Sequence, residues 1–173
     1  MIEVEVFGAG TRAHSSEGWV DGGVRALASA APGAPTFVEV QRLCILAAAS
    51  AGIQEGHLAI EFVDAERITQ LNAEYRKQPT PTDVLSFPVD GADVIAHAES
   101  LRVTEPIAGE ESEVQSTAGN IRELGDVVIC PEHTVDLREA IVHGVLHLLG
   151  MDHETDNGEM LALQRELLTW ESR

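Results

Sequence analysis

Cysteine is scarce in this sequence: its 173 residues include two, Cys44 and Cys130. Both lie among apolar residues, which favours reduced thiols in a hydrophobic core over a disulfide framework. With 44% hydrophobic residues, the chain is long enough to bury one core. One domain over residues 1–173 is therefore the natural count.

Long hydrophobic runs and an N-terminal targeting pattern are also lacking. The sequence has no run of about eighteen or more apolar residues, the length that indicates a transmembrane helix. Its N-terminus, MIEVEVFGAG, has no basic region followed by an apolar stretch, the pattern of a signal peptide. We therefore expect a cytoplasmic protein with no membrane contact.

Basic residues are the third scarce class. Twenty-nine acidic residues against eleven basic ones give a formal net charge of -18, and Lys77 is the one lysine. Phosphate contacts by lysine and arginine supply most non-specific affinity for nucleic acid, so this balance opposes binding to a polyanion. Any nucleic-acid substrate should therefore meet a local basic cleft. Part of the acidic surplus lies in a predicted solvated loop, at Glu99, Glu105, Glu110, Glu111 and Glu113.

Three histidines stand close together in the segment HGVLHLLGMDH, at His143, His147 and His153. Histidines four residues apart project from the same helical face, so His143 and His147 can reach one ion. Gly150 then lets the backbone leave the helix in a left-handed conformation, which brings His153 back toward them. Three nitrogen ligands leave a divalent ion such as zinc an open coordination position, as in catalytic sites.

The same spacing occurs in metzincin peptidases, where the residue after the first histidine is the glutamate that acts as general base. Here that residue is Gly144, so the pattern favours metal hydrolysis but not peptide-bond cleavage. An isolated His-x-x-x-His pair is often part of a core or a surface; the third histidine and the glycine favour a metal site. Cys130 as a fourth ligand is an alternative, because closed structural zinc sites use cysteine.

The periodicity of apolar residues predicts an α+β fold. Alternation or short apolar runs predict strands at 2–7, 57–63, 83–87 and 124–130, and helical spacing predicts helices at 37–51, 137–149 and 157–170. Asp64 is expected to cap a further helix with Ile68, Leu71 and Tyr75 on one face. We expect a single domain with a mixed sheet of about four strands packed with about four to five α-helices, one of them a metzincin-like helix carrying the metal site. Residues 8–35 are expected to form an irregular insertion, and residues 88–122 a loop with one extended stretch at 101–103.

Three motifs together resemble the YbeY family of bacterial rRNA-maturation endoribonucleases: HGVLHLLGMDH, LNAEYRKQPTPTDVLSFP and LGDVVICPE. The resemblance covers residues 37–168; residues 8–35 and a short segment between Cys130 and Ile141 depart from it. It implies a single-strand-specific, metal-dependent endoribonuclease that processes the 3′ end of small-subunit ribosomal RNA and acts in ribosome quality control. It also implies one zinc ion per chain on His143, His147 and His153, with the ribosome or ribosomal proteins as partners.

The family's functional arginine falls on Arg76, which with His147 makes the pair of candidate catalytic residues. A guanidinium can hold two phosphate oxygens and oppose the charge that develops during phosphoryl transfer. From the sequence alone, a surface arginine at the C-terminus of a helix is the favoured interpretation, and the resemblance reverses that preference. Two other functions stay open: a metzincin-like metallohydrolase or peptidase, and a ribosome assembly factor whose zinc is structural.

The polar residues near the motifs have weaker assignments. Asp152 can orient a histidine through its second ring nitrogen or stabilise a turn. Asp83 and Ser86 are expected near the cleft or in capping roles, and Asp126 in buried hydrogen bonding. The histidines expected not to be ligands are His57, His97 and His133.

Overall fold

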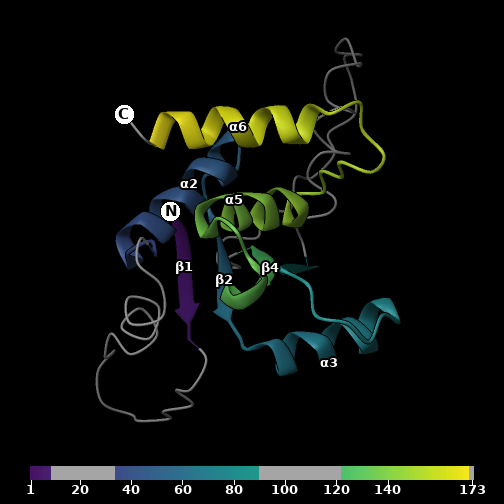
Figure 1. The fold of residues 1–173 in the computed structure, drawn as a ribbon. Coiled ribbons are helices and arrows are strands. Elements are labelled where there is room, and N and C mark those ends of the chain that lie inside the picture. The colour runs from purple at the N-terminus through teal and green to yellow at the C-terminus, as the bar shows by residue number, and fades with distance from the viewer. Residues whose placement is uncertain (9–33, 90–121, 172–173) are drawn as a thin grey trace, which may run out of the picture.

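The computed structural model describes residues 1–8, 34–89 and 122–171 (Figure 1). Its elements in chain order are β1 (Ile2–Phe7), α2 (Phe37–Ser50), β2 (Gly56–Phe62), α3 (Ala65–Arg76), β3 (Val84–Pro88), β4 (Glu123–Ile129), the 3-10 helix η1 (Pro131–His133), α5 (Leu137–Leu148) and α6 (Glu159–Glu171). The α+β prediction is confirmed. The bulk of the expected insertion at 8–35, the stretch at 101–103, the acidic loop and His97 lie outside the described residues.

The described strands form one mixed sheet in the order β1-β2-β4-β3. β1 pairs parallel with β2, and β2 pairs parallel with β4, with Ile60 opposite Val127. β3 pairs antiparallel with β4, and Ser86 lies opposite Val127. This arrangement confirms the prediction of a mixed sheet of four strands and makes β1 an edge strand.

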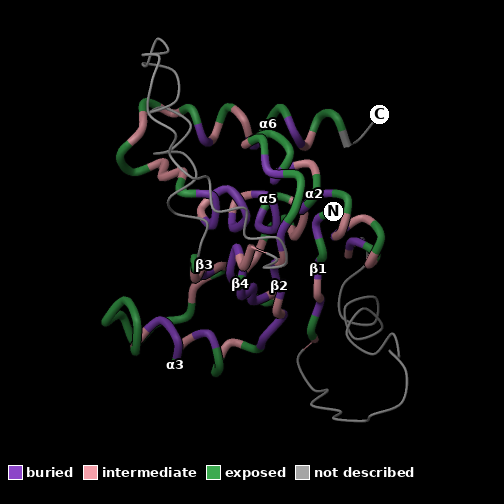
Figure 2. Tube along the Cα trace, turned by 180° about the vertical axis from the view of Figure 1, so that it is seen from behind, coloured by how far each residue is buried: buried purple, intermediate pink, exposed green. Residues whose placement is uncertain are grey.

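The helices cover the two faces of the sheet unequally (Figures 1 and 2). α2 and α5 pack on one face, and α6 packs on the outer side of these two helices. The main core on this side contains Leu43, Leu58, Ile60, Val127, Ile141, Leu146 and Met160. α3 lies on the other face with a smaller cluster that contains Ile68, Leu71, Leu85, Val128 and Cys130. The sheet is therefore buried most deeply beneath α5, the helix that carries two of the three histidines.

Side-chain caps explain where the helices begin. Thr36 and Glu39 form a capping box at the start of α2, and Asp64 accepts a hydrogen bond from the backbone N–H of Arg67 at the start of α3. Asp136 accepts from two backbone N–H groups at the start of α5. The predicted bounds of the helices are correct to within one or two residues.

Tyr75 does not share the buried face of α3, contrary to expectation. Ile68 and Leu71 are buried, but Tyr75 is 60% exposed. It lies in the last turn of α3, where its ring contacts Phe87 edge-on with centroids 4.9 Å apart. The final turn of α3, which carries Arg76, is therefore exposed and lies beside β3.

Candidate metal centre and active-site cleft

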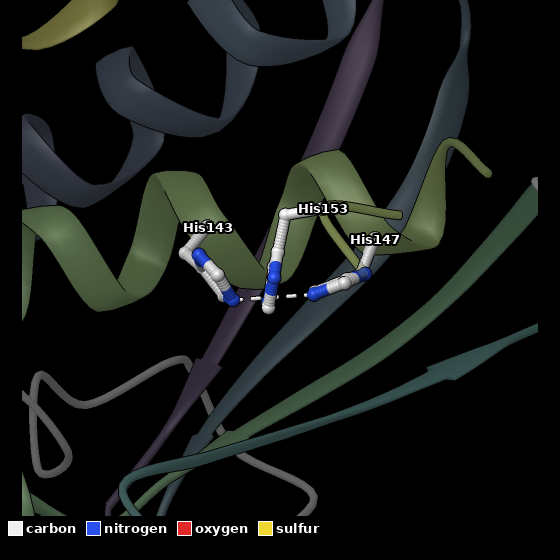
Figure 3. Close-up of side chains that lie close together, drawn as sticks. All are labelled: His143, His147 and His153. Carbon is white, nitrogen blue, oxygen red and sulfur yellow. Dashed lines mark hydrogen bonds between the residues drawn. The ribbon is translucent and has the colours of Figure 1, made fainter. Parts of the chain in front are cut away.

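His143 and His147 lie one turn apart on α5, and a turn after the helix brings His153 beside them (Figure 3). The turn contains Gly150, whose φ of 90° is a left-handed conformation that glycine adopts without strain. One ligand nitrogen from each histidine lies within 4.8 Å of the others, and all three residues are half-buried. The structure thus brings together the three residues that the spacing predicted as metal ligands.

Hydrogen bonds fix the orientation of the two rings on α5. Nδ1–H of His147 donates to the backbone carbonyl of Met151 at 2.9 Å, because a carbonyl oxygen only accepts. Nδ1 of His143 lies 2.9 Å from Oε1 of Gln164, on α6. In both rings Nε2 then faces inward, and the two Nε2 atoms are 3.1 Å apart.

The contact between the two Nε2 atoms fits a shared cation. With protons on both Nδ1 atoms, two neutral rings bring lone pair against lone pair and have no hydrogen to place between them. An ion that both nitrogens bind removes this repulsion. Nitrogens on one tetrahedral zinc ion lie about 3.3 Å apart, given zinc–nitrogen bonds of about 2.0–2.1 Å, which is near the separation seen here.

The described residues contribute three ligands to this group and no fourth cysteine or carboxylate. Cys130, the alternative fourth ligand, is fully buried in the smaller hydrophobic cluster beneath α3. His57 instead contacts Glu123 at 2.8 Å and Glu5 at 3.8 Å, and His133 lies in η1. The donor set is therefore that of an open site.

The environment of His147 keeps its ring neutral. Burial lowers the pKa of His147, and the neighbouring His143 lowers it further, whereas the hydrogen bond to Met151 acts in the opposite direction. A ring with a lowered pKa is unprotonated at neutral pH, and only an unprotonated nitrogen binds a metal. The lowered pKa of His147 therefore suits the role of a metal ligand.

The histidines open into a cleft of about 910 Å³ between α5, β3 and the end of α3. Its lining residues are Arg76, Gln78, Thr82, Asp83, Val84, Ser86, Pro88, His143, His147, Gly150, Met151, Asp152, His153 and Glu154. Arg76 thus lies in the same cleft as the histidines. The lining has one guanidinium against three carboxylates, so the expectation of a basic cleft is wrong for the described residues. A divalent cation would balance this charge.

Asp83 and Ser86 line the cleft and also support its wall. Ser86 donates from Oγ to the backbone carbonyl of Gly144 at 3.0 Å, which ties β3 to α5. Asp83 accepts from the backbone N–H of Val84 at 2.9 Å and from Oγ1 of Thr82 at 3.0 Å. Asp83 and Ser86 therefore lie at the cleft, as expected, and also make hydrogen bonds that hold β3 and its N-terminal turn in place.

The structure favours one of the two roles expected for Asp152 and corrects the expectation for Asp126. Asp152 accepts from the backbone N–H of Glu154 at 3.0 Å and stabilises the turn. It does not orient the histidines of α5, because Nδ1 of His143 contacts Gln164 and Nδ1 of His147 contacts the carbonyl of Met151. Asp126 is exposed rather than buried in a hydrogen-bond network. Partial desolvation against the sheet, followed by the charge of Glu123, raises the pKa of Asp126.

Gln164 and Glu139 are site residues that the sequence reasoning missed. Gln164 is 3% exposed and donates from Nε2 to Oε1 of Glu139 at 2.8 Å. The sequence does contain a signal, because Gln164 lies four residues after Met160 and three before Leu167, on the apolar face of the predicted helix. A polar residue at such a position needs a partner. The backbone carbonyl of Met151 has no comparable signal in the sequence.

A family model described as Endoribonuclease YbeY matches residues 38–170 of this chain. The chain belongs to the YbeY family. The match spans every helix of the described fold, the cleft and all three histidines. In the described part of this YbeY chain, no helix is both long enough and apolar enough to cross a membrane.

Curated relatives named Endoribonuclease YbeY are also similar to this chain. The protein from Campylobacter jejuni subsp. jejuni strain 81-176 is 35% identical over 109 residues, which cover 63% of this chain and 71% of that protein. The protein from Geobacillus thermodenitrificans is 36% identical over 143 residues, 75% of this chain and 83% of that protein. The solution structure of TM1509 from Thermotoga maritima is 21% identical with a TM-score of 0.46, covering 98% of this chain and 92% of that chain.

Proposed function

We propose that this chain is a zinc-dependent endoribonuclease that cleaves single-stranded RNA in the maturation of ribosomal RNA, at the 3′ end of the small-subunit RNA, and in ribosome quality control. The observation that carries the proposal is the convergence of His143, His147 and His153 in the lining of a cleft. Membership of the YbeY family, whose model is described as an endoribonuclease, supports the reaction class.

The three histidines would hold one zinc ion per chain through nitrogen atoms and leave one face toward the cleft. A bound divalent ion activates water and polarises a phosphoryl oxygen. Imidazole ligands also suit other divalent metals, but zinc accepts three nitrogens with an open fourth position. His147 has the central place, because its Nε2 faces that of His143 and its Nδ1 is held by the backbone.

Arg76 would bind the phosphate that is cleaved. It lies at the end of α3, is exposed, and lines the cleft with the histidines. Its planar, permanently charged group can hold two phosphate oxygens and oppose the negative charge that develops as the bond breaks. Arg76 is the one arginine or lysine among the lining residues, so no other permanently charged side chain of the described lining can bind the phosphate in its place.

The remaining parts of the proposal follow from charge and context. A chain with a formal net charge of -18 suits a protein partner with a basic face, such as a ribosomal protein, because opposite charges speed association. We place its action on the ribosome in the cytoplasm, as a single domain over residues 1–173 with residues 8–35 as an insertion.

The first experiment compares His147→Ala with His133→Ala. The first variant should lose both metal loading, measured by elemental analysis, and cleavage of a single-stranded RNA. His133 is exposed in η1 and lies outside the cluster, so its variant should keep both. Full-rate cleavage by metal-free protein would refute the proposal, and zinc-dependent turnover of casein without turnover of RNA would favour the peptidase alternative.

The second experiment compares Arg76→Ala with Arg67→Ala on the same helix. Arg67 is exposed but does not line the cleft. Arg76→Ala should keep its zinc and its association with ribosomes but lose RNA cleavage by about 100-fold or more, the scale of one removed charge-stabilising donor. Arg67→Ala should cleave normally. Unchanged RNA processing by Arg76→Ala would favour an assembly factor with a structural metal.

A further inference from the structure

Gln164 is a buried polar residue on a helix whose other buried contacts are apolar. It lies on α6 between Met160 and Leu167, both buried, and is 3% exposed. Its Oε1 lies 2.9 Å from Nδ1 of His143, and its Nε2 donates to Oε1 of Glu139 at 2.8 Å. The amide therefore links a candidate metal ligand on α5 to a carboxylate one turn earlier on the same helix.

Glu139 determines which end of the Gln164 amide faces the histidine. An ionised carboxylate only accepts hydrogen bonds, so the amide must turn its NH2 group toward Glu139 and its oxygen toward the ring. An amide oxygen also only accepts, so Nδ1 of His143 must carry the proton. Amide orientation and histidine tautomer are ordinarily ambiguous, and here an exposed carboxylate in the first turn of α5 settles both.

This proton position decides where the lone pair of His143 lies. A proton on Nδ1 leaves Nε2 unprotonated, and Nε2 is the atom that faces His147 (Figure 3). His147 reaches the same state through a backbone carbonyl, at Met151, which side-chain substitution does not remove. The Nδ1 atom of His143 instead contacts a side chain of another helix, Gln164 of α6. Of these two histidines, His143 is therefore the one whose tautomer a substitution at its partner can change.

We propose that Gln164, oriented by Glu139, is a positioning residue that fixes the Nδ1–H tautomer of His143 and presents its Nε2 to the metal. This inference rests on the proposed metal site. A ring that holds its proton on Nε2 must lose or move it before binding an ion, which weakens affinity. Hydrogen bonds to the outer nitrogen of metal-binding histidines typically change metal affinity about 10- to 100-fold.

The first test observes the tautomer in metal-free protein, where no ion contributes. Ring nitrogen chemical shifts from NMR at pH about 8, where ordinary histidines are neutral, distinguish a protonated from an unprotonated nitrogen. Wild-type His143 should be protonated on Nδ1. Gln164→Leu, which keeps the size but removes the acceptor, should move His143 to the Nε2–H form or to a mixture. An unchanged Nδ1–H signal in this variant would overturn the proposal.

The second test measures zinc affinity by competition with a chromophoric chelator. Gln164→Leu should bind zinc about 10- to 100-fold more weakly than wild type. Glu139→Gln keeps the shape but can donate as well as accept, so it no longer enforces one amide orientation and should show a smaller loss. Wild-type affinity in Gln164→Leu would overturn the proposed role even if the tautomer had changed.

Leu167→Ala is the matched control for packing between α5 and α6. Leu167 is 5% exposed, lies one turn after Gln164 and touches neither histidine nor Glu139 through a hydrogen bond. This variant should unfold at lower temperature but keep the His143 tautomer and the zinc affinity of wild type. An equal loss of zinc affinity in Leu167→Ala would show that Gln164 acts through packing alone. If wild-type protein binds no metal, the proposed function fails while the tautomer result stays readable.

Discussion

Gly144 on α5 lies directly against Val127 on β4. A Cβ atom added at Gly144 would collide with Cγ1 of Val127 and lie 3.2 Å from Cγ2 of both Val127 and Val84. The position after His143 therefore faces the sheet, and it does not line the cleft. A glutamate there, as in metzincin peptidases, would be driven into the core, so this fold has no place for the peptidase base.

Gly144→Ala should destabilise the protein, although alanine is the better helix former by about 1 kcal/mol. Overpacking costs about 1–3 kcal/mol. Val127 cannot move away from the added methyl group, because its strand β4 is paired on both sides. The overpacking cost less the gain in helix propensity leaves a net loss of up to about 2 kcal/mol in the free energy of unfolding, measured with urea.

Val127→Ala makes this prediction sharper, because it removes the atoms that collide. Alone it should destabilise the core by leaving a cavity. In that background Gly144→Ala should stabilise the protein, since its methyl group enters the vacated space. The effect of one substitution thus changes sign with the other; additive effects of the two substitutions would contradict the close approach.

Zinc should raise the melting temperature of the wild-type chain. An ion at 100 times its dissociation constant stabilises the folded state by about 2.7 kcal/mol, or about 5–10 °C for a domain of this size. Calorimetry with zinc and with a chelator measures the shift. It should fall sharply in His153→Ala and persist in His133→Ala; a full shift in His153→Ala would place the ion elsewhere.

RNA binding should depend only weakly on salt. The described lining of the cleft offers one cation, Arg76, and each phosphate contact to a single strand contributes a slope of about -0.7. Between about 50 and 200 mM salt, the KM for a single-stranded oligoribonucleotide should therefore rise less than about threefold. A rise of 100-fold or more would require several further cations at the RNA and would contradict this assignment.

Glu39 should contribute to stability in a pH-dependent way. The backbone N–H of Thr36, followed by the side chain of Arg138 at 2.8 Å, lowers the pKa of Glu39 from 4.5 to about 2. A lowered pKa stabilises the fold above the unfolded value, and this stability is lost as pH falls from about 4.5 to about 2. After allowance for solvent screening, Glu39→Gln should cost about 1–2 kcal/mol at pH 7.

The test is urea unfolding of wild type and Glu39→Gln at pH 7 and at low pH. The difference between the two should shrink as pH falls below about 4.5 and should approach zero only below about pH 2, where the Glu39 carboxyl is protonated in the folded protein as well. Glu55→Gln is the control, since the carboxylate of Glu55 is 87% exposed and should contribute little at either pH. A constant difference for Glu39→Gln would rule out the charge as its cause.

The parts of the site that local geometry determines were predictable from the sequence. A helical repeat of four residues and a glycine turn are enough to bring His143, His147 and His153 together, because the three ligands lie within eleven residues. Helix caps such as Asp64 and Asp136 are likewise local. For the same reason the element bounds differ little from the structure.

The parts that depend on contacts between distant elements were not predictable. Gln164 meets His143 across two packed helices, and sequence spacing does not specify which faces of α5 and α6 meet. The charge of the cleft lining also depends on which segments converge there, so a local basic surface was wrongly expected. Tyr75 followed the helical repeat of Ile68 and Leu71, but its ring meets Phe87 of β3 only edge-on and stays 60% exposed.

The packing of α6 against α5 means that the proposed metal site is complete only once the last helix has been made. A nascent chain that stops before residue 159 already carries every histidine of the cluster. It still lacks the amide from the last helix that orients one of them. On the proposed function, a product truncated before α6 would hold its ion poorly, and a newly made chain would load metal fully only after synthesis of α6.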